Sequence, residues 1–257
     1  NMKKTIRDLL LVENTQLNKD NFRLVLESSE PLPVIKAGQF VNVEVSQSTD
    51  TFLRRPFSVL NVDNVNNQIS LLIKILGRAS KVLTTYKVGE TVSIIFPLGN
   101  GFTTPNTTDN ILLIGGGSGV APMFNIAKTC GLPKTQIHIL LGARSVDDHI
   151  DASDFEQYAN IYKASEDGTI GEKGFVTNHS IYSDLSKFNK VYTCGPEPMM
   201  IAIAADTSKA GIFCEVSLEN MMACGFGVCL CCVEKTKKGN QCVCTEGPVF
   251  NVNELSW

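Results

Sequence analysis

Six of the nine cysteines in this chain of 257 residues lie in one short stretch near its carboxyl end. They are Cys224, Cys229, Cys231, Cys232, Cys242 and Cys244. Thiols at this density can form disulfides, bind a structural zinc ion, or bind an iron–sulfur cluster that carries electrons. Their spacing and the character of the remaining sequence bear on the choice.

The spacing of four of these cysteines favours a [2Fe–2S] cluster. The pattern C-x4-C-x2-C-x11-C, which starts at residue 224, resembles the plant-type ferredoxin arrangement for such a cluster. A four-thiolate zinc site is the main alternative, but structural zinc ligands usually come as two short pairs, whereas here three ligands crowd one loop. The predicted cluster ligands are Cys224, Cys229, Cys232 and Cys244.

The whole chain is of mixed composition and mildly acidic. Its formal charge is −3 and 43% of its residues are hydrophobic, enough for up to three domains with their own cores. No basic cluster indicates nucleic acid, and no apolar run reaches the roughly 18–20 residues of a membrane span. The stretch "NMKKTIRDLLLVEN" lacks the features of a signal peptide. We therefore expect a cytoplasmic protein, in which disulfides are the weakest of the three options.

Three styles of sequence follow one another and predict three domains. Residues 1–102 read as short strands between turns, such as "GQFVNVEVS" and "ISLLIKIL", and predict an antiparallel Greek-key β-barrel. Residues 103–214 alternate strands such as "NILLIGGG" with helices such as "APMFNIAKTCG", which is typical of an α/β domain with a parallel sheet. Residues 215–257 make a small cysteine-rich domain that is too short to build a core without a staple.

A glycine turn between a predicted strand and helix, "ILLIGGGSGVAP", suits the pyrophosphate of a dinucleotide. Gly116, Gly117 and Gly119 let the backbone approach the ligand, and the helix N-terminus offers free N–H groups. The alternative is a tight turn without a ligand. The spacing of these glycines also differs from the usual G-x-G-x-x-G, which disfavours an ordinary Rossmann dehydrogenase. A second apolar strand, "KVYT", should end beside the same crevice. We expect it to contribute Cys194, Gly195 and Pro196.

The hexapeptide "RRPFSV" at 54–59 lies inside the predicted barrel. Alone it can be an exposed strand edge, although Arg55 suits a phosphate and Ser58 suits a ring heteroatom. The order "RPFS", "PLGNGF", "GGGSGVAP" and "CGP" resembles the ferredoxin–NADP reductase superfamily, in which the barrel binds FAD and the α/β domain binds a nicotinamide dinucleotide. The resemblance implies flavin contacts from Arg55, Pro56, Phe57, Ser58, Leu72, Ile73, Lys74, Ala79 and Ser80, with Ser80 capping a helix.

The same resemblance bears on the choice of nucleotide. NADP-specific members place a basic residue in the turn that here reads "KASEDGTIGEKG", where Glu166 and Asp167 would repel a 2′-phosphate. We therefore expect NAD(H) as the substrate. Hydride transfer between nicotinamide and flavin is chemistry of the cofactors themselves, so no catalytic acid or base is expected.

The full chain resembles a narrower family, the electron-transfer subunits of NAD-linked, class 1B dihydroorotate dehydrogenases. The resemblance rests on "SLENMMACGFGVCLCC" before "CTEGPVF", and the second string selects Cys244 as the last ligand. It implies an FMN-containing dihydroorotate dehydrogenase catalytic subunit as partner, in a heterotetramer of the pyrimidine pathway. Electrons would pass from that FMN through [2Fe–2S] and FAD to NAD+. Apolar residues of "GFGV" and "PVF" are expected to face the partner, unless they pack internally.

Three points stay open. A near relative, the small subunit of NADH-dependent ferredoxin:NADP oxidoreductases, shares all three modules, but its first cluster ligand is typically an aspartate, so Cys224 favours the dihydroorotate family. Two further functions, a stand-alone NADH:acceptor reductase and a zinc-binding scaffold, also stay open. Cys231 and Cys242 are the expected spare thiols, since Cys242 should alternate with Cys244 on a strand and point away from the ligands.

Overall fold

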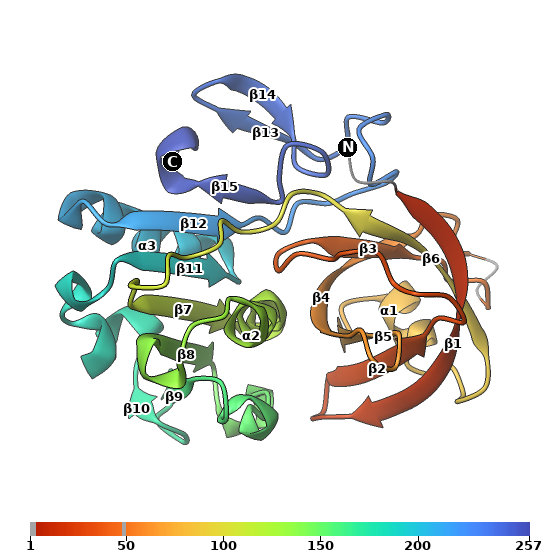
Figure 1. Cartoon of the computed structure of the whole chain (residues 1–257), viewed down its shortest axis with the longest axis horizontal. Coiled ribbons are helices and arrows are strands. Elements are labelled where there is room, and N and C mark those ends of the chain that lie inside the picture. Colours follow the sequence, from red (N-terminus) through yellow and green to blue (C-terminus); the bar gives the residue numbers. More distant parts are fainter. Residues whose placement is uncertain (1–3, 48–49) are drawn as a thin grey trace.

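A barrel, a sheet and a carboxyl-terminal segment laid along both make up the computed structural model, which describes residues 4–47 and 50–257 (Figure 1). The barrel contains β1 (Thr5–Gln16), β2 (Asn21–Glu27), β3 (Phe40–Val43), β4 (Arg55–Asp63), β5 (Gln68–Lys74) and β6 (Thr91–Leu98), with the helix α1 (Arg78–Leu83) after β5. Its six antiparallel strands close in the order β1-β2-β5-β4-β3-β6, which confirms the predicted barrel.

The barrel follows from alternation along its strands. In β1, Leu9 and Leu11 are fully buried, whereas Leu10 between them is 43% exposed. Leu24 and Leu26 of β2 fill the same core from the neighbouring strand. Alternate side chains therefore fill one common core, and closure of the sheet leaves no unpaired strand edge.

The sheet of the second lobe is parallel except at one edge. It contains β7 (Ile111–Gly116), β8 (Ile137–Ala143), β9 (Asn160–Ser165), β10 (Glu172–Lys173), β11 (Lys190–Cys194), β12 (Phe213–Ser217) and β15 (Val249–Asn251), with the helices α2 (Val120–Thr129) and α3 (Glu197–Ala210). The strand order is β10-β9-β8-β7-β11-β12-β15. This confirms the predicted α/β domain, but β15 runs antiparallel to β12 and comes from the cysteine-rich segment, which the sequence did not indicate.

Short 3-10 helices punctuate the connections. They are η1 (Gly117–Gly119), η2 (Lys134–Gln136), η3 (Val146–Asp148), η4 (Ser153–Phe155), η5 (Val176–Asn178), η6 (Ser180–Tyr182), η7 (Leu185–Lys187) and η8 (Val252–Glu254). None of the helices in the described part of the chain is long and apolar enough to span a membrane.

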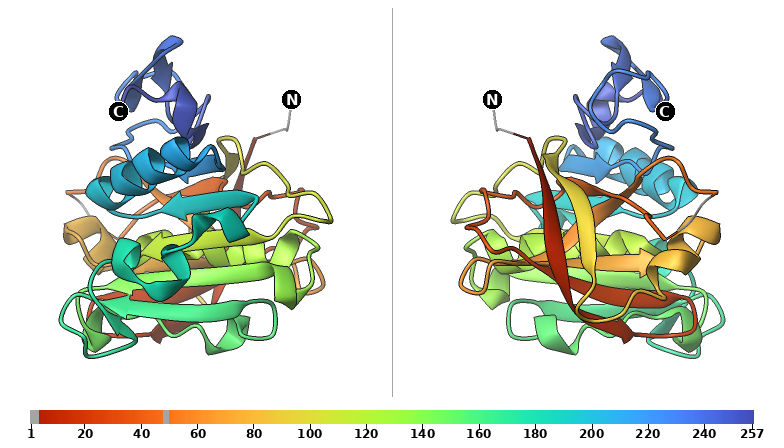
Figure 2. Two further views of the ribbon diagram at one scale, coloured as in Figure 1. Left: turned by 90° about the vertical axis from the view of Figure 1, so that its left-hand side faces the viewer. Right: turned by 90° about the vertical axis from the view of Figure 1, so that its right-hand side faces the viewer.

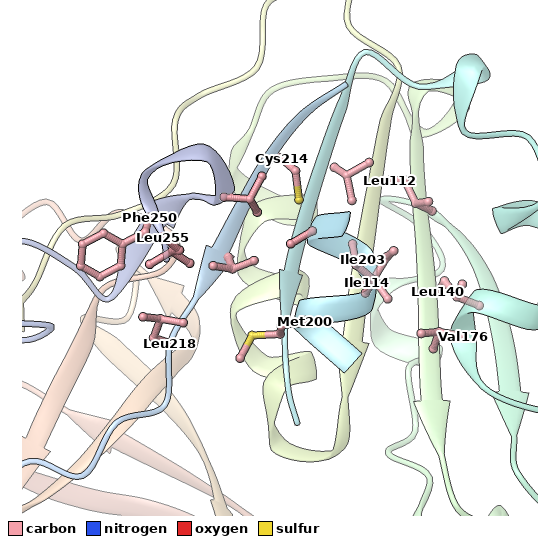
Figure 3. Packing of buried hydrophobic residues seen from close by; sticks show 14 of the residues in the cluster. Leu112, Ile114, Leu140, Val176, Met200, Ile203, Cys214, Leu218, Phe250 and Leu255 are labelled. Carbon is pink, nitrogen blue, oxygen red and sulfur yellow. The ribbon is translucent and has the colours of Figure 1, made fainter. Parts of the chain in front are cut away.

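The two long helices cover opposite faces of the sheet. Leu113 of β7 packs with Phe124 of α2, whereas Leu112 of the same strand packs in the cluster that contains Met200 and Ile203 of α3 (Figure 3). A strand that is buried on both faces reads as a continuous apolar run, which explains "ILLI" at its start.

Helix α2 also joins the two lobes. Asn125 Nδ2 donates a hydrogen bond to the carbonyl of Val59 (3.3 Å), and Lys128 Nζ donates to Asn61 Oδ1 (2.6 Å), both on β4. The helix that follows the glycine turn is thereby held against the strand that begins with the "RPFS" residues. The two predicted cofactor regions face each other across this contact.

The carboxyl-terminal segment rests on both lobes and projects from one end of the molecule (Figure 2). It contains the hairpin of β13 (Val233–Thr236) and β14 (Gly239–Cys242), and it returns to the sheet as β15. Leu218, Phe250 and Leu255 pack into the same cluster as the α3 residues (Figure 3). The predicted boundary between residues 214 and 215 falls inside β12, so this segment shares its first strand with the sheet.

Candidate functional site

The larger of two adjoining cavities, about 470 Å³, opens where the strand order of the sheet reverses between β7 and β11. Ligands of open α/β sheets bind at this kind of switch point, outside the carboxyl ends of the strands. Gly116, Gly117 and Pro196, which are predicted nucleotide contacts, line the cavity. Gly117 has a φ angle of +57°, which glycine tolerates.

The other predicted residues of this region shape the cavity without lining it. A Cβ atom on Gly119 would lie 2.3 Å from the carbonyl oxygen of Cys194, so only glycine lets the start of α2 pack against the end of β11. Gly195 has a φ angle of +149°, and its Cβ would lie 2.9 Å from the carbonyl oxygen of Gly116. Close packing of backbone on backbone therefore fixes the distance between the two cavity walls.

Charged side chains line one part of the larger cavity. Glu166 lines it as predicted, whereas Asp167 does not, because its carboxylate accepts hydrogen bonds from the N–H (2.9 Å) and the hydroxyl (2.7 Å) of Thr169. Arg144, which no motif of the sequence indicated, also lines the cavity and pairs with Asp148 (Nε–Oδ2, 3.2 Å). The cavity is therefore lined by two cations, Lys74 and the paired Arg144, and by the carboxylates of Asp148 and Glu166.

The smaller cavity, about 230 Å³, lies between the barrel and the carboxyl-terminal segment. Five of the predicted flavin contacts line it: Pro56, Phe57, Ser58, Leu72 and Lys74. The opposite wall comes from the segment that leads to the cysteines, with Leu218, Glu219, Asn220 and Met222. An apolar wall with a few polar groups is typical of a site for a planar cofactor, so the residues present fit a flavin.

Arg55, the predicted phosphate contact, does not line the cavity. Its guanidinium donates to the carbonyl oxygens of Leu53 (2.8 Å) and Arg54 (3.3 Å) and makes no ion pair with another described residue. The preceding Arg54 is instead engaged with Glu44 at 2.7 Å. Of the two arginines in the motif, Arg55 thus keeps its charge unpaired by any described carboxylate.

The last three predicted flavin contacts, Ile73, Ala79 and Ser80, do not line the smaller cavity. Ile73 is fully buried in the barrel core, so its side chain does not reach the cavity, and Ala79 is buried in the same core. Ser80 was expected to cap its helix, but α1 begins at Arg78 with Gly77 at the N-cap, and Ser80 lies at the third helical position. Its hydroxyl oxygen still accepts the N–H of Gly77 (3.1 Å), because a serine there can bond backward to the cap.

Lys74 and Glu219 occupy the junction of the two cavities. Lys74, the last residue of β5, lines both of them. The thiol of the fully buried Cys194 donates to Glu219 Oε1 (3.9 Å). Glu219 is exposed by surface area where it lines the smaller cavity, yet the protein around its carboxyl raises the pKa of that group, and the charge of Lys74 opposes the rise. No sequence signal singled out Glu219, although it directly precedes the cysteine-rich stretch.

The four predicted cluster ligands come together as two pairs of thiols. Cys224 interacts with Cys229 through their side chains, and Cys232 interacts with Cys244 in the same way. Among the residues that the structure describes, no three His, Cys, Asp or Glu side chains converge as ligands of one metal ion. Paired thiols suit a cluster in which each of two irons takes two cysteine ligands, so these residues fit [2Fe–2S] better than a single zinc ion.

Backbone N–H groups point at each of these four sulfurs. The Sγ of Cys244 accepts from Gly227 (3.1 Å), and the Sγ of Cys232 accepts from the N–H of Cys244 (3.4 Å). The Sγ of Cys224 accepts from the N–H of Phe226, and the Sγ of Cys229 accepts from the N–H of Cys224, both at 3.5 Å. Gly227 has a φ angle of +89°, which the loop needs to turn its N–H inward.

The pKa values of Cys224 and Cys244 show where the protein favours or disfavours a thiolate. Burial raises the pKa of Cys224, but hydrogen bonds from the backbone, led by that of Phe226, outweigh it and lower the pKa to about 6. At the other pair, burial and the neighbouring Cys232 raise the pKa of Cys244 to about 12. The thiolate is the ligand form of cysteine, and a bound metal cation favours it, so metal binding would offset the burial that disfavours the thiolate of Cys244.

The two spare thiols lie beside the ligands. Cys231 is exposed, and Cys242 is half-buried at the end of β14, opposite Val233. The reason predicted for setting Cys242 aside is wrong, because β14 ends at Cys242 and Cys244 lies beyond the strand, so the two do not alternate along it. Cys244 is nevertheless buried, at 1% exposure, and bonded within the ligand set.

The chain itself links the smaller cavity to the thiols. Met222 lines the cavity and Cys224 follows two residues later, so their Cα atoms lie at most about 7 Å apart. On the outer side, an apolar surface surrounds the ligand loop. It consists of Met221, Phe226, Val228, Leu230 and Val233, which are 38–84% exposed. Phe226 and Val228 of "GFGV" are thus exposed, whereas Gly225 and the residues of "PVF" are buried.

Comparison with known proteins agrees with this three-part site. Family models match residues 8–102 as an oxidoreductase FAD-binding domain, 113–205 as an oxidoreductase NAD-binding domain, and 219–256 as the iron-sulfur cluster binding domain of dihydroorotate dehydrogenase B. The electron transfer subunit of dihydroorotate dehydrogenase B (NAD(+)) from Shouchella clausii is 34% identical, over 99% of both chains. The subunit of the same name from Fusobacterium nucleatum is 33% identical, over 97% of this chain and 98% of its own.

This chain belongs to the family of dihydroorotate dehydrogenase B electron transfer subunits. Among solved structures, the NADH-dependent reduced ferredoxin-NADP oxidoreductase superposes with a TM-score of 0.84 at 27% identity, over 97% of this chain and 90% of that one. The ferredoxin reductase of carbazole 1,9a-dioxygenase (24% identity, TM-score 0.70, 82% and 67% covered) shares the fold. The family carries FAD-binding, NAD-binding and cluster-binding domains, as the sequence predicted.

Proposed function

We propose that this chain passes electrons from the FMN of a partner dihydroorotate dehydrogenase through a [2Fe–2S] cluster and FAD to NAD+, in pyrimidine biosynthesis. The observation that carries the proposal is the continuity of the three sites. Lys74 lines both cavities, and Met222 connects the smaller cavity to the first thiol pair. Nucleotide, flavin and cluster would therefore lie side by side in the order that the transfer needs.

The proposed holders of each group follow from these positions. The larger cavity would hold NAD(H), with the backbone of Gly116 and Gly117 against the pyrophosphate and Glu166 disfavouring a 2′-phosphate. The smaller cavity would hold the flavin ring against Phe57 and Ser58. The predicted ligands Cys224, Cys229, Cys232 and Cys244 would hold the cluster.

The bound groups supply the redox chemistry: hydride exchange at the flavin and nicotinamide, and one-electron transfer at the cluster. The protein positions them and sets the local charge. Lys74 places a cation between the two cavities, where it offsets the charge of Glu219. Burial raises the pKa of the Cys194 thiol well above its usual value and so keeps the thiol protonated. The thiol therefore donates a hydrogen bond to Glu219 and does not act as a nucleophile.

The exposed apolar surface around the ligand loop is the proposed docking face for the catalytic partner. Val228 and Leu230, 75% and 63% exposed, flank Cys229, so a partner that covers them comes close to the cluster. We propose a heterotetramer with that FMN-containing subunit, in the cytoplasm. The relatives are named as electron transfer subunits, which supports a catalytic partner chain.

Anaerobic purification tests the cofactor assignment. We expect a coloured protein with bound FAD and with two iron and two sulfide per chain, whose flavin absorbance is bleached by NADH. Co-expression with a dihydroorotate dehydrogenase catalytic subunit should then give dihydroorotate-dependent reduction of NAD+ that this chain lacks alone. A colourless protein that holds zinc would contradict the proposal.

A double substitution tests the docking face. Val228→Glu with Leu230→Glu should abolish co-purification of the catalytic subunit, because two carboxylates would be buried in an apolar contact. Val65→Glu is the matched control, since Val65 is 90% exposed in the turn between β4 and β5, away from the ligand loop. If the double variant still binds the partner, the face is assigned wrongly. Fast NADH-dependent reduction of a ferredoxin without any partner would favour the stand-alone reductase.

A further inference from the structure

A buried asparagine of the barrel contacts the first cluster ligand directly. Asn42 lies on β3, opposite Pro56 of the "RPFS" motif on β4, and is only 1% exposed. Its Nδ2 donates a hydrogen bond to the carbonyl oxygen of Cys224 (3.0 Å), across a separation of 182 residues. The strand that flanks the flavin cavity is thus bonded to the backbone of the ligand loop.

The other half of this side chain has no partner. Asn42 Oδ1 is buried and accepts no hydrogen bond from any described residue. The amide cannot be turned over, because the Cys224 carbonyl can only accept and Oδ1 would then face another oxygen. A buried polar atom without a partner is costly, so the bond that Nδ2 makes to the ligand loop has to offset that cost.

The loop is shaped to receive this contact. Gly225 has a φ angle of +80°, and a Cβ atom there would lie 2.8 Å from Asn42 Nδ2 and 3.5 Å from Leu98 Cδ1. The loop therefore lies directly on the barrel surface. The peptide between Cys224 and Gly225 is planar and trans, so a bond to its carbonyl also fixes the direction of its N–H. This N–H points away from the barrel.

We propose that Asn42 is a positioning residue that anchors the first cluster-ligand loop to the flavin barrel and thereby sets the environment of the cluster and its coupling to the flavin. The inference rests on the proposed function, since it presumes the cluster at these thiols. No acid–base or covalent step is assigned to Asn42. Its contribution is a fixed contact between the cavity wall and the ligand loop.

The first test uses Asn42→Leu, which introduces an apolar side chain of similar size and removes the donor. Amide hydrogen exchange should become at least tenfold faster across residues 224–229. In the anaerobic protein, NADH should bleach the flavin within twofold of the wild-type rate, while electron transfer from flavin to cluster slows at least tenfold. Asn14→Leu is the matched control: Asn14 Nδ2 donates to the backbone carbonyls of Thr84 (3.1 Å) and Tyr86 (2.7 Å), and its Oδ1 also accepts from no described residue, but these contacts lie within the barrel.

The second test uses Asn42→Ala, so that a failure of the leucine variant to fold does not decide the matter. Alanine also removes the donor but is too small to clash with the ligand loop, so the exchange and transfer rates should change as in the leucine variant. Loss of the donor at the Cys224 carbonyl disfavours the more negative, reduced cluster, so we expect about a threefold lower ratio of reduced to oxidised cluster at a fixed potential. Electron paramagnetic resonance of the reduced cluster reports the change.

The outcomes separate the two proposals. Wild-type exchange, transfer rate and potential in both Asn42 variants would overturn the anchoring role while the relay stands. Wild-type protein without iron and sulfide would overturn the relay, and the exchange experiment would still decide whether Asn42 anchors the loop. Equal effects of Asn14→Leu on the ligand loop would show a general loss of packing and would also reject the specific role.

Discussion

The substitution Gly119→Ala places a methyl group where the structure has no room for one. Its Cβ would lie 2.3 Å from the carbonyl oxygen of Cys194 and 2.6 Å from the nitrogen of Gly195, and both are backbone atoms that no rotamer change can move. The end of β11 must retreat from α2 until these contacts exceed about 3.0 Å. Overpacking of this kind costs about 1–3 kcal/mol.

This displacement acts on the wall shared by the nucleotide site and the Cys194–Glu219 contact. A misplacement near 1 Å can lower a rate by about 10²-fold, so we expect at least a tenfold loss of kcat/KM in NADH:ferricyanide reduction. The melting temperature should fall by roughly 2–4 °C for each kcal/mol lost. Gly77→Ala is the control, because its φ angle of −170° is extended and nothing lies within 4 Å of the new Cβ. Wild-type kinetics and melting for Gly119→Ala would refute this steric explanation.

Three further predictions concern the cluster and the nucleotide. Cys232→Ser should remove most iron and sulfide in elemental analysis, whereas Cys231→Ser should keep both; the reverse result would reassign the ligands. Glu166→Ser should raise the ratio of kcat/KM for NADPH over NADH roughly tenfold in steady-state kinetics, since a like charge is removed, and Asp167→Ser should leave that ratio unchanged because Asp167 does not line the cavity. A reductive titration should place the cluster potential well above the roughly −400 mV of plant-type ferredoxins, and a value near −400 mV would argue against electron flow toward NAD+.

The sequence predicted the fold well where one physical signal dominated. Alternation such as Leu9 and Leu11 specifies a strand with one buried face, and the continuous run in β7 specifies a strand buried on both. Glycine positions were equally informative, because Gly119 and Gly195 lie so close to backbone atoms that there is no room for a side chain. These are local rules, and they were sufficient to predict the barrel, the sheet and the glycine turn.

Features that depend on distant partners were not predictable from local pattern. β15 reads as the tail of a cysteine motif, and only the exposed edge of β12 makes it a strand of the sheet. Glu219 looks like an ordinary charged residue until Lys74 and Cys194, from two different domains, are brought beside it. The expected alternation of Cys242 with Cys244 failed for the same reason, since the strand ends where the chain turns toward the ligand set.

The attachment of the carboxyl-terminal segment to both lobes explains how so short a piece can hold a cluster at a defined place. On the barrel side, Asn100 donates to the carbonyl oxygens of Thr245 and Glu246, each at 2.9 Å. On the sheet side, β15 pairs with β12 and buries Phe250. A segment tied at two points to separate domains cannot follow either one alone, so relative movement of the lobes would strain the ligand loop. Rigid contact between the lobes, which α2 provides through Lys128, is therefore a condition for a fixed distance between flavin and cluster.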